Sequence, residues 1–139
     1  MANYEVVDHT ADWALRIWGQ DFADLLLHAA LGMNSLMIGE EISVSPAATE
    51  TITRTLTFDT FDSETLLVDW LTELAYFAEM EQLIFPTITL SHVTATHLHA
   101  QIQGSPVPKL VKHIKAVTYH NLKIAETTNG LEVTIVFDV

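Results

Sequence analysis

The strongest structural signal in this chain is an amphipathic stretch over residues 64–80. At about 100° per residue, its large apolar side chains fall on one arc of a helix. The arc comprises Leu66, Leu67, Trp70, Leu71, Leu74, Phe77 and Ala78. Residues 22–37 repeat the three-and-four spacing, and Asp21 before them is suited to cap a helix. The sequence therefore predicts two main helices, each with a buried stripe.

Most of the remaining chain is predicted to be β-strand. Residues 50–58 alternate polar and apolar side chains along their whole length, which predicts a strand with one buried face. Further strands are predicted at 4–7, 13–18, 84–85, 87–93, 96–103, 121–126 and 131–137, with a loop at 104–108 and a hairpin turn at 127–130. The predicted fold class is α+β: a single two-layer domain over residues 1–139, with two main helices packed on largely antiparallel β-sheet.

Composition narrows the functional classes. The 18 acidic and 6 basic residues give a formal net charge of −12, which repels phosphate backbones, so we expect no direct nucleic-acid binding. No apolar run approaches the roughly 20 residues that cross a bilayer, and no signal peptide is recognised, so we expect a cytoplasmic protein without a membrane partner. The absence of cysteine excludes disulfides, thiolate catalysis and zinc-finger sites.

A polar cluster, Asp8-His9-Thr10-Ala11-Asp12, connects the first two predicted strands. Loops held by rigid elements concentrate functional side chains, and carboxylates beside an imidazole can bind a cation or a charged partner group. The alternative is a simple turn, in which the Asp and Thr side chains bond nearby backbone N–H groups.

Other acidic positions lie farther along the chain. The Asp138 carboxylate and the terminal carboxylate of Val139 are within one residue of each other, and such a pair can chelate calcium, magnesium or manganese. A fraying terminus is the alternative. Glu73 falls at the margin of the apolar arc, between Trp70 and Phe77. A carboxylate there needs a cation, a backbone donor or a basic residue unless it reaches solvent.

Four segments taken together resemble the archease family in their order and spacing over essentially the whole chain. They are His9-Thr10-Ala11-Asp12, the helical segment from Leu67 to Leu74, Lys115-Ala116-Val117-Thr118-Tyr119-His120, and the terminal Phe137-Asp138-Val139. The resemblance implies an activator of an RNA-splicing ligase that uses GTP and manganese and joins 3′-phosphate or 2′,3′-cyclic phosphate ends to 5′-hydroxyl ends. Such a protein promotes ligase guanylylation and multiple turnover, in tRNA splicing or RNA repair, and is not itself an enzyme.

The resemblance also implies the site residues. Calcium is the implied ion, with manganese or magnesium as alternatives that oxygen ligands also suit. Its implied ligands are Asp12, Asp138 and the terminal carboxylate of Val139. Ligase activation is implied for Asp12, Glu73, Lys115 and Asp138, with His9 and His120 as supporting positions. Carboxylates gathered together would repel one another, which a divalent cation and Lys115 would offset.

The chain departs from the family pattern in two places. Trp13-Ala14 stand where the family usually has a small or glycine-containing run, and residues 104–113 form a short, basic loop. Lys109, Lys112 and Lys115 carry half of the positive charges of the chain in this region.

The sequence is also compatible with two other functions. His9, Asp12, His120 and Asp138 would suit a metal-assisted phosphoester hydrolase, with His120 as acid or base near neutral pH. However, no phosphate-cradling loop or recognised nucleophile arrangement accompanies them. The third function is a general chaperone or modulator of nucleic-acid-modifying proteins. The sequence does not specify an oligomeric state.

Overall fold

The computed structural model describes residues 3–8, 13–39 and 51–139. The elements in chain order are β1 (Tyr4–Asp8), β2 (Trp13–Gly19), α1 (Phe22–Ile38), β3 (Ile52–Asp59), α2 (Ser63–Glu81), β4 (Leu83–Ser91), β5 (His97–Pro106), β6 (Ala116–Thr118), β7 (Ala125–Thr127) and β8 (Gly130–Asp138). Both predicted helices are confirmed, and Asp21 caps α1 by accepting a hydrogen bond from the Asp24 N–H over 2.8 Å.

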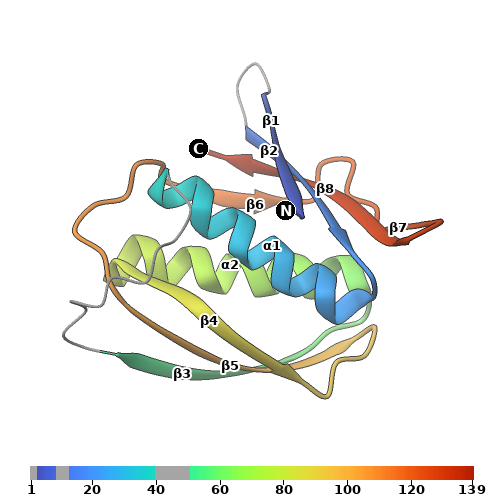
Figure 1. Ribbon diagram of the computed structural model, residues 1–139, viewed down its shortest axis with the longest axis horizontal. Coiled ribbons are helices and arrows are strands. Elements are labelled where there is room, and N and C mark those ends of the chain that lie inside the picture. The colour runs from blue at the N-terminus through green and yellow to red at the C-terminus, as the bar shows by residue number, and fades with distance from the viewer. Residues whose placement is uncertain (1–2, 9–12, 40–50) are drawn as a thin grey trace.

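The described strands form two antiparallel sheets. The larger sheet has the order β1-β2-β8-β6, with β7 also paired to β8, and the smaller has the order β3-β5-β4. Figure 1 shows the two helices between these sheets, and both helices contact both sheets. The predicted α+β class, with two main helices on antiparallel sheet, is confirmed. The predicted two layers are three in the structure, because the strands are divided between two sheets that cover the helices on two sides.

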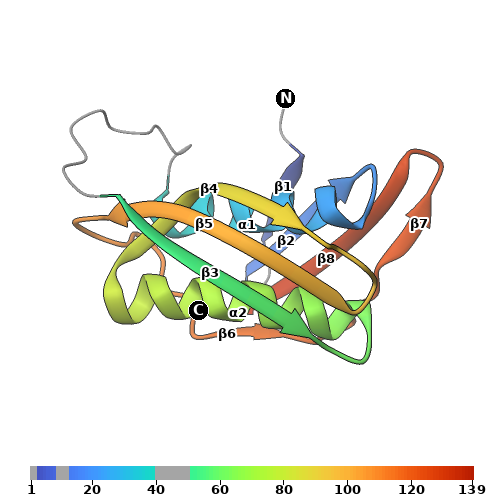
Figure 2. The same ribbon diagram turned by 90° about the horizontal axis from the view of Figure 1, so that it is seen from below.

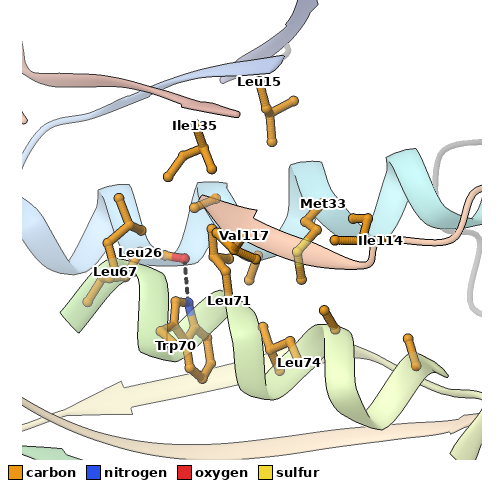
Figure 3. Close-up of a cluster of buried hydrophobic side chains, with 14 of the residues drawn as sticks. Leu15, Leu26, Met33, Leu67, Trp70, Leu71, Leu74, Ile114, Val117 and Ile135 are labelled. Carbon is orange, nitrogen blue, oxygen red and sulfur yellow. Dashed lines mark hydrogen bonds between the residues drawn. The ribbon is translucent and has the colours of Figure 1, made fainter. Parts of the chain in front are cut away.

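The hydrophobic core fills the space between the helices and the sheets. Figure 3 shows side chains from both helices and from β2, β6 and β8 meeting there. The indole N–H of Trp70 on α2 donates a 2.9 Å hydrogen bond to the carbonyl oxygen of Leu26 on α1, so a buried polar group is satisfied and joins the helices. No helix among the described residues is long and apolar enough to cross a membrane.

An irregularity in β4 fixes the position of this strand against α1. The pairing of β4 with β5 shifts register between Ile84 and Thr87, around Pro86, which has no backbone N–H to donate. The side-chain amide of buried Asn34 donates a 3.1 Å hydrogen bond to the carbonyl oxygen of Phe85. Gly104 lies opposite, where a Cβ would overlap the carbonyl oxygen of Ile84. The bulge therefore depends on the absence of a side chain at Gly104 of β5 and on the hydrogen bond from Asn34 of α1.

Two of the sequence predictions for the second half of the chain are wrong. The strand predicted at 121–126 is reduced to the short strand β7, which begins only at Ala125. Asn121 has a positive φ of 51° and turns the chain before it. The Ile124 N–H donates to the Glu64 carboxylate over 3.1 Å and so takes no part in a sheet. The predicted loop at 104–108 starts too early, since β5 continues to Pro106 and pairs there with Leu83. Figure 2 shows β5 crossing the molecule between β3 and β4.

Candidate functional site

Strands β2 and β8 bring two of the predicted site segments to the same end of the larger sheet. Trp13, the first described residue after the His9 to Asp12 segment, pairs with Phe137, and Ala116 pairs with Asp138. The start of β2 therefore lies beside the end of β8 and the start of β6, as Figure 1 shows. We call Trp13, Lys115, Asp138 and Val139 the β2–β8 end. His9 and Asp12 lie outside the described residues.

Lys115 and Asp138 are joined through their main chains at the β2–β8 end. The Lys115 N–H donates a 2.7 Å hydrogen bond to the Asp138 carbonyl oxygen. Both residues are exposed, so their charged groups are accessible to an ion or a partner. Val139 is half-buried and packs against the hydrophobic core. This contact disfavours the fraying terminus that the sequence left as an alternative.

The residues at the β2–β8 end fit the chemistry of the implied calcium ion. The Asp138 carboxylate is a hard oxygen donor, as the implied terminal carboxylate of Val139 would be, and calcium prefers such donors over nitrogen or sulfur. Within the described ranges, no group of three or more His, Asp or Glu residues is arranged to hold a metal ion. The third implied ligand, Asp12, lies outside those ranges. The described part of the chain thus supplies oxygen donors for the site but not a complete set of ligands.

Glu73 occupies the predicted margin of the apolar stripe of α2. It is half-buried between Trp70 and Phe77. The Trp70 ring packs edge-on against Phe58 of β3, with 6.2 Å between ring centres, and the Phe77 ring lies 5.4 Å from Phe85 of β4. This side of α2 therefore faces the smaller sheet.

The larger sheet and the segment that leads to β6 lie along a different face of α2. There the Glu79 carboxylate contacts the imidazole of His113 over 3.0 Å. Among the ion pairs of the described residues, none joins Glu73 to Lys115. The structure thus brings Lys115 and Asp138 together and places Glu73 on another side of the molecule.

His120 lies two residues beyond the end of β6. That strand runs away from the β2–β8 end, since Ala116 pairs with Asp138 and Thr118 pairs with Val136. The His120 side chain is exposed, and its Nε2 lies 3.3 Å from the side-chain amide of Asn121. No ion pair joins His120 to Asp138 within the described chain.

Residues 109–115, which we call the basic segment, cover the C-terminal end of α1. The N–H groups of Val111 and Lys112 both donate to the carbonyl oxygen of Met37, over 2.7 and 3.1 Å. The last turn of α1 contains no basic residue. Because the C-terminal end of a helix carries partial negative charge, a basic segment from elsewhere in the chain complements it.

The basic segment also reaches β2. The Lys112 Nζ atom lies 3.6 Å from the centre of the Trp13 ring. Trp13 and Lys112 both lie where the sequence departs from the family pattern. A contact between positions so far apart in the chain cannot be predicted from local sequence spacing. Lys112 is therefore a residue of the candidate site that sequence reasoning missed.

A separate cleft of about 540 Å³ lies near the opposite end of α1. It is bounded by the first residues of both helices and by β7 and β8, with Phe22, Glu64, Ile124 and Leu131 in its lining. None of the predicted site residues contributes to it within the described chain.

Comparison with known proteins identifies relatives along nearly the whole chain. The family model described as the Archease protein family (MTH1598/TM1083) matches residues 4–139. The protein archease of Methanosarcina barkeri is 30% identical over 145 residues, which cover 98% of this chain and 95% of that protein. The archease-like protein of Dictyostelium discoideum is 27% identical and covers 100% of this chain and 95% of its own length.

Two solved structures share the fold. The solution structure of Methanobacterium thermoautotrophicum protein 1598 superposes with a TM-score of 0.71 at 22% identity, and each chain is covered completely. The crystal structure of an archease from Thermotoga maritima, described as a possible chaperone, gives a TM-score of 0.66 at 23% identity. It covers 97% of this chain and 96% of its own. At these identities the likeness establishes the fold alone.

Proposed function

Because the chain belongs to the archease family, we propose that it is a metal-binding protein cofactor of a GTP- and manganese-dependent RNA-splicing ligase. It promotes guanylylation of the ligase and allows multiple turnovers in tRNA splicing or RNA repair. It acts in the cytoplasm as an activator and does not catalyse a reaction itself.

The observation that carries this proposal is the juxtaposition of Lys115 and Asp138. The two residues come from different segments of the chain, and a 2.7 Å main-chain hydrogen bond joins them while both are exposed. A net charge of −12 makes this protein a poor ligand for RNA and a better one for a positively charged or metal-containing protein surface. The geometry therefore supports contact with a protein or a metal ion at the β2–β8 end.

In the proposed mechanism, Asp12, Asp138 and the terminal carboxylate of Val139 would hold a divalent cation, for which we propose calcium. Manganese and magnesium suit the same oxygen ligands. A bound cation would offset the repulsion between the carboxylates. The β2–β8 end then enters the ligase active site, where its carboxylates help to place or replace the metal ions of the ligase.

A direct test is the guanylylation step. The cognate ligase is incubated with labelled GTP and manganese, alone or with this protein, and covalent label on the ligase is measured. Faster labelling in the presence of this protein supports an activator, and an unchanged rate contradicts it.

A general chaperone is the second candidate function, because the Thermotoga maritima archease is described as a possible chaperone. This candidate predicts protection of unrelated nucleic-acid-modifying proteins against aggregation. That protection would be insensitive to substitution of Asp138, whereas ligase activation would not be.

A further inference from the structure

Lys112 makes a close contact with an aromatic ring. Its Nζ atom is 3.6 Å from the centre of the Trp13 ring, whereas the two other cation–ring pairs in the described chain, Arg16 with Trp18 and Arg54 with Phe77, are separated by 6.0 and 5.9 Å. A cation is attracted to the face of an aromatic ring within about 6 Å, and tryptophan is the strongest partner. Trp13 is half-buried, so solvent screens this attraction only in part.

The main chain beneath the Lys112 side chain is fixed. The N–H groups of Lys112 and Val111 both bond to the carbonyl oxygen of Met37 at the end of α1. On either side, Leu110 and Ile114 are only 5% and 2% exposed. Because the backbone of Lys112 is held in place, less conformational entropy is lost when its ammonium group is held over the Trp13 ring.

The basic segment thereby contacts both strands of the β2–β8 end. Lys112 lies against Trp13 at the start of β2, while the Lys115 N–H bonds to the carbonyl oxygen of Asp138 at the end of β8. Trp13 is paired with Phe137, the residue before Asp138. A displacement of Trp13 would therefore disturb the last residues of β8.

We propose that Lys112 is a positioning residue, which holds Trp13 and so keeps the start of β2 and the end of β8 in register at the candidate metal and partner site. Lys112 itself is not a ligand in this proposal. The calcium readout below rests on the proposed function, and the exchange readout does not.

The test uses the full chain with Lys112→Met, Lys112→Arg and, as a matched control from the same segment, Lys109→Met. Amide hydrogen exchange at Lys115 is followed by NMR, and calcium binding is followed by calorimetry. Lys112→Met is expected to speed exchange at Lys115 and to weaken calcium binding, each by about tenfold, because methionine keeps the packing and loses the cation. Lys112→Arg and Lys109→Met are expected to resemble the wild type.

A double-mutant cycle with Trp13→Leu separates the ring contact from a general loss of structure. In the Trp13→Leu background, replacing Lys112 with Met should have little further effect on exchange at Lys115. An effect of full size in that background, or unchanged exchange in Lys112→Met alone, overturns the proposal. If the wild type binds no calcium, the proposed metal site fails, while exchange at Lys115 still decides the role of Lys112.

Discussion

The backbone N–H of Lys115 donates a hydrogen bond to the carbonyl oxygen of Asp138 over 2.7 Å. This contact uses only main-chain atoms, so it does not depend on the lysine side chain. The exposed ammonium group of Lys115 and carboxylate of Asp138 are therefore separable from the fold that positions them. Substitutions that change only these groups should test function without changing stability.

Lys115→Gln is the first such substitution. It keeps the main-chain bond to Asp138 and removes the charge, so the free energy of unfolding should change by less than about 0.5 kcal/mol, as for most surface substitutions. Ligase activation should fall strongly. Urea unfolding and a guanylylation assay measure the two quantities, and Lys123→Gln, at another exposed lysine, is the control. Full activation by Lys115→Gln would contradict a role for this charge.

Glu73→Gln should separate activation from metal binding. Glu73 lies on the side of α2 that faces the smaller sheet, away from the Lys115 and Asp138 pair. Because Glu73 lies away from the proposed metal ligands, the calcium affinity of the variant, measured by calorimetry, should stay that of the wild type. The family resemblance implies a role for Glu73 in ligase activation, so activation should be lost. Asp138→Ala should lose both. Asp69→Asn, at an exposed position of the same helix, is the control. Weakened calcium binding in Glu73→Gln would show that Glu73 belongs to the metal site.

Asn34→Leu should destabilise the fold by about 1–3 kcal/mol, because the carbonyl oxygen of Phe85 would lose its partner inside the protein. Leucine has nearly the same shape as asparagine, so packing changes little. Urea unfolding provides the measurement, with Gln101→Leu on the exposed face of β5 as the control. Equal stability of Asn34→Leu and the wild type would mean that this bond does not hold the β4 bulge.

The N-terminal cap of α2 predicts a pH effect. The pKa of the Asp62 carboxyl group is lowered by two hydrogen bonds from Thr65, first that of its hydroxyl and then that of its backbone N–H. Because this pKa is lower in the folded than in the unfolded chain, the cap contributes stability above about pH 4 and loses it as the pH falls further. The stability difference between the wild type and Asp62→Asn should therefore shrink in urea unfolding as the pH falls below about 4. A difference that stays constant would argue against the charged cap.

The helices and most of the strands could be predicted because their signals are local. The apolar arc of residues 64–80 and the alternation of residues 50–58 each report one buried face. The division into two sheets could not be predicted, since β2 pairs with β8 across most of the chain and no local pattern encodes that choice. The predicted strand at 121–126 was wrong because its apolar residues Leu122 and Ile124 pack against the core from a turn.

Only the part of the candidate site that has local sequence signals could be predicted. Short motifs identified Lys115 and Asp138, and the β6–β8 pairing then places them together. The contact between Lys112 and Trp13 depends on how the basic segment crosses the end of α1, which is a property of tertiary packing. Glu73 was correctly predicted at the margin of its helix, but only the structure shows which sheet that margin faces.

Multiple-turnover RNA ligation by the cognate ligase, with GTP and manganese, is the decisive measurement for an activator that works through Asp138. The assay compares the wild-type protein, Asp138→Ala and Glu126→Ala at equal concentration. Glu126→Ala is the control, because its exposed carboxylate lies far from the β2–β8 end. We expect the wild type and the control to raise ligation well beyond one turnover, and Asp138→Ala to fail to do so although it remains folded. Stimulation by Asp138→Ala equal to that of the wild type would show that activation does not depend on the Asp138 carboxylate.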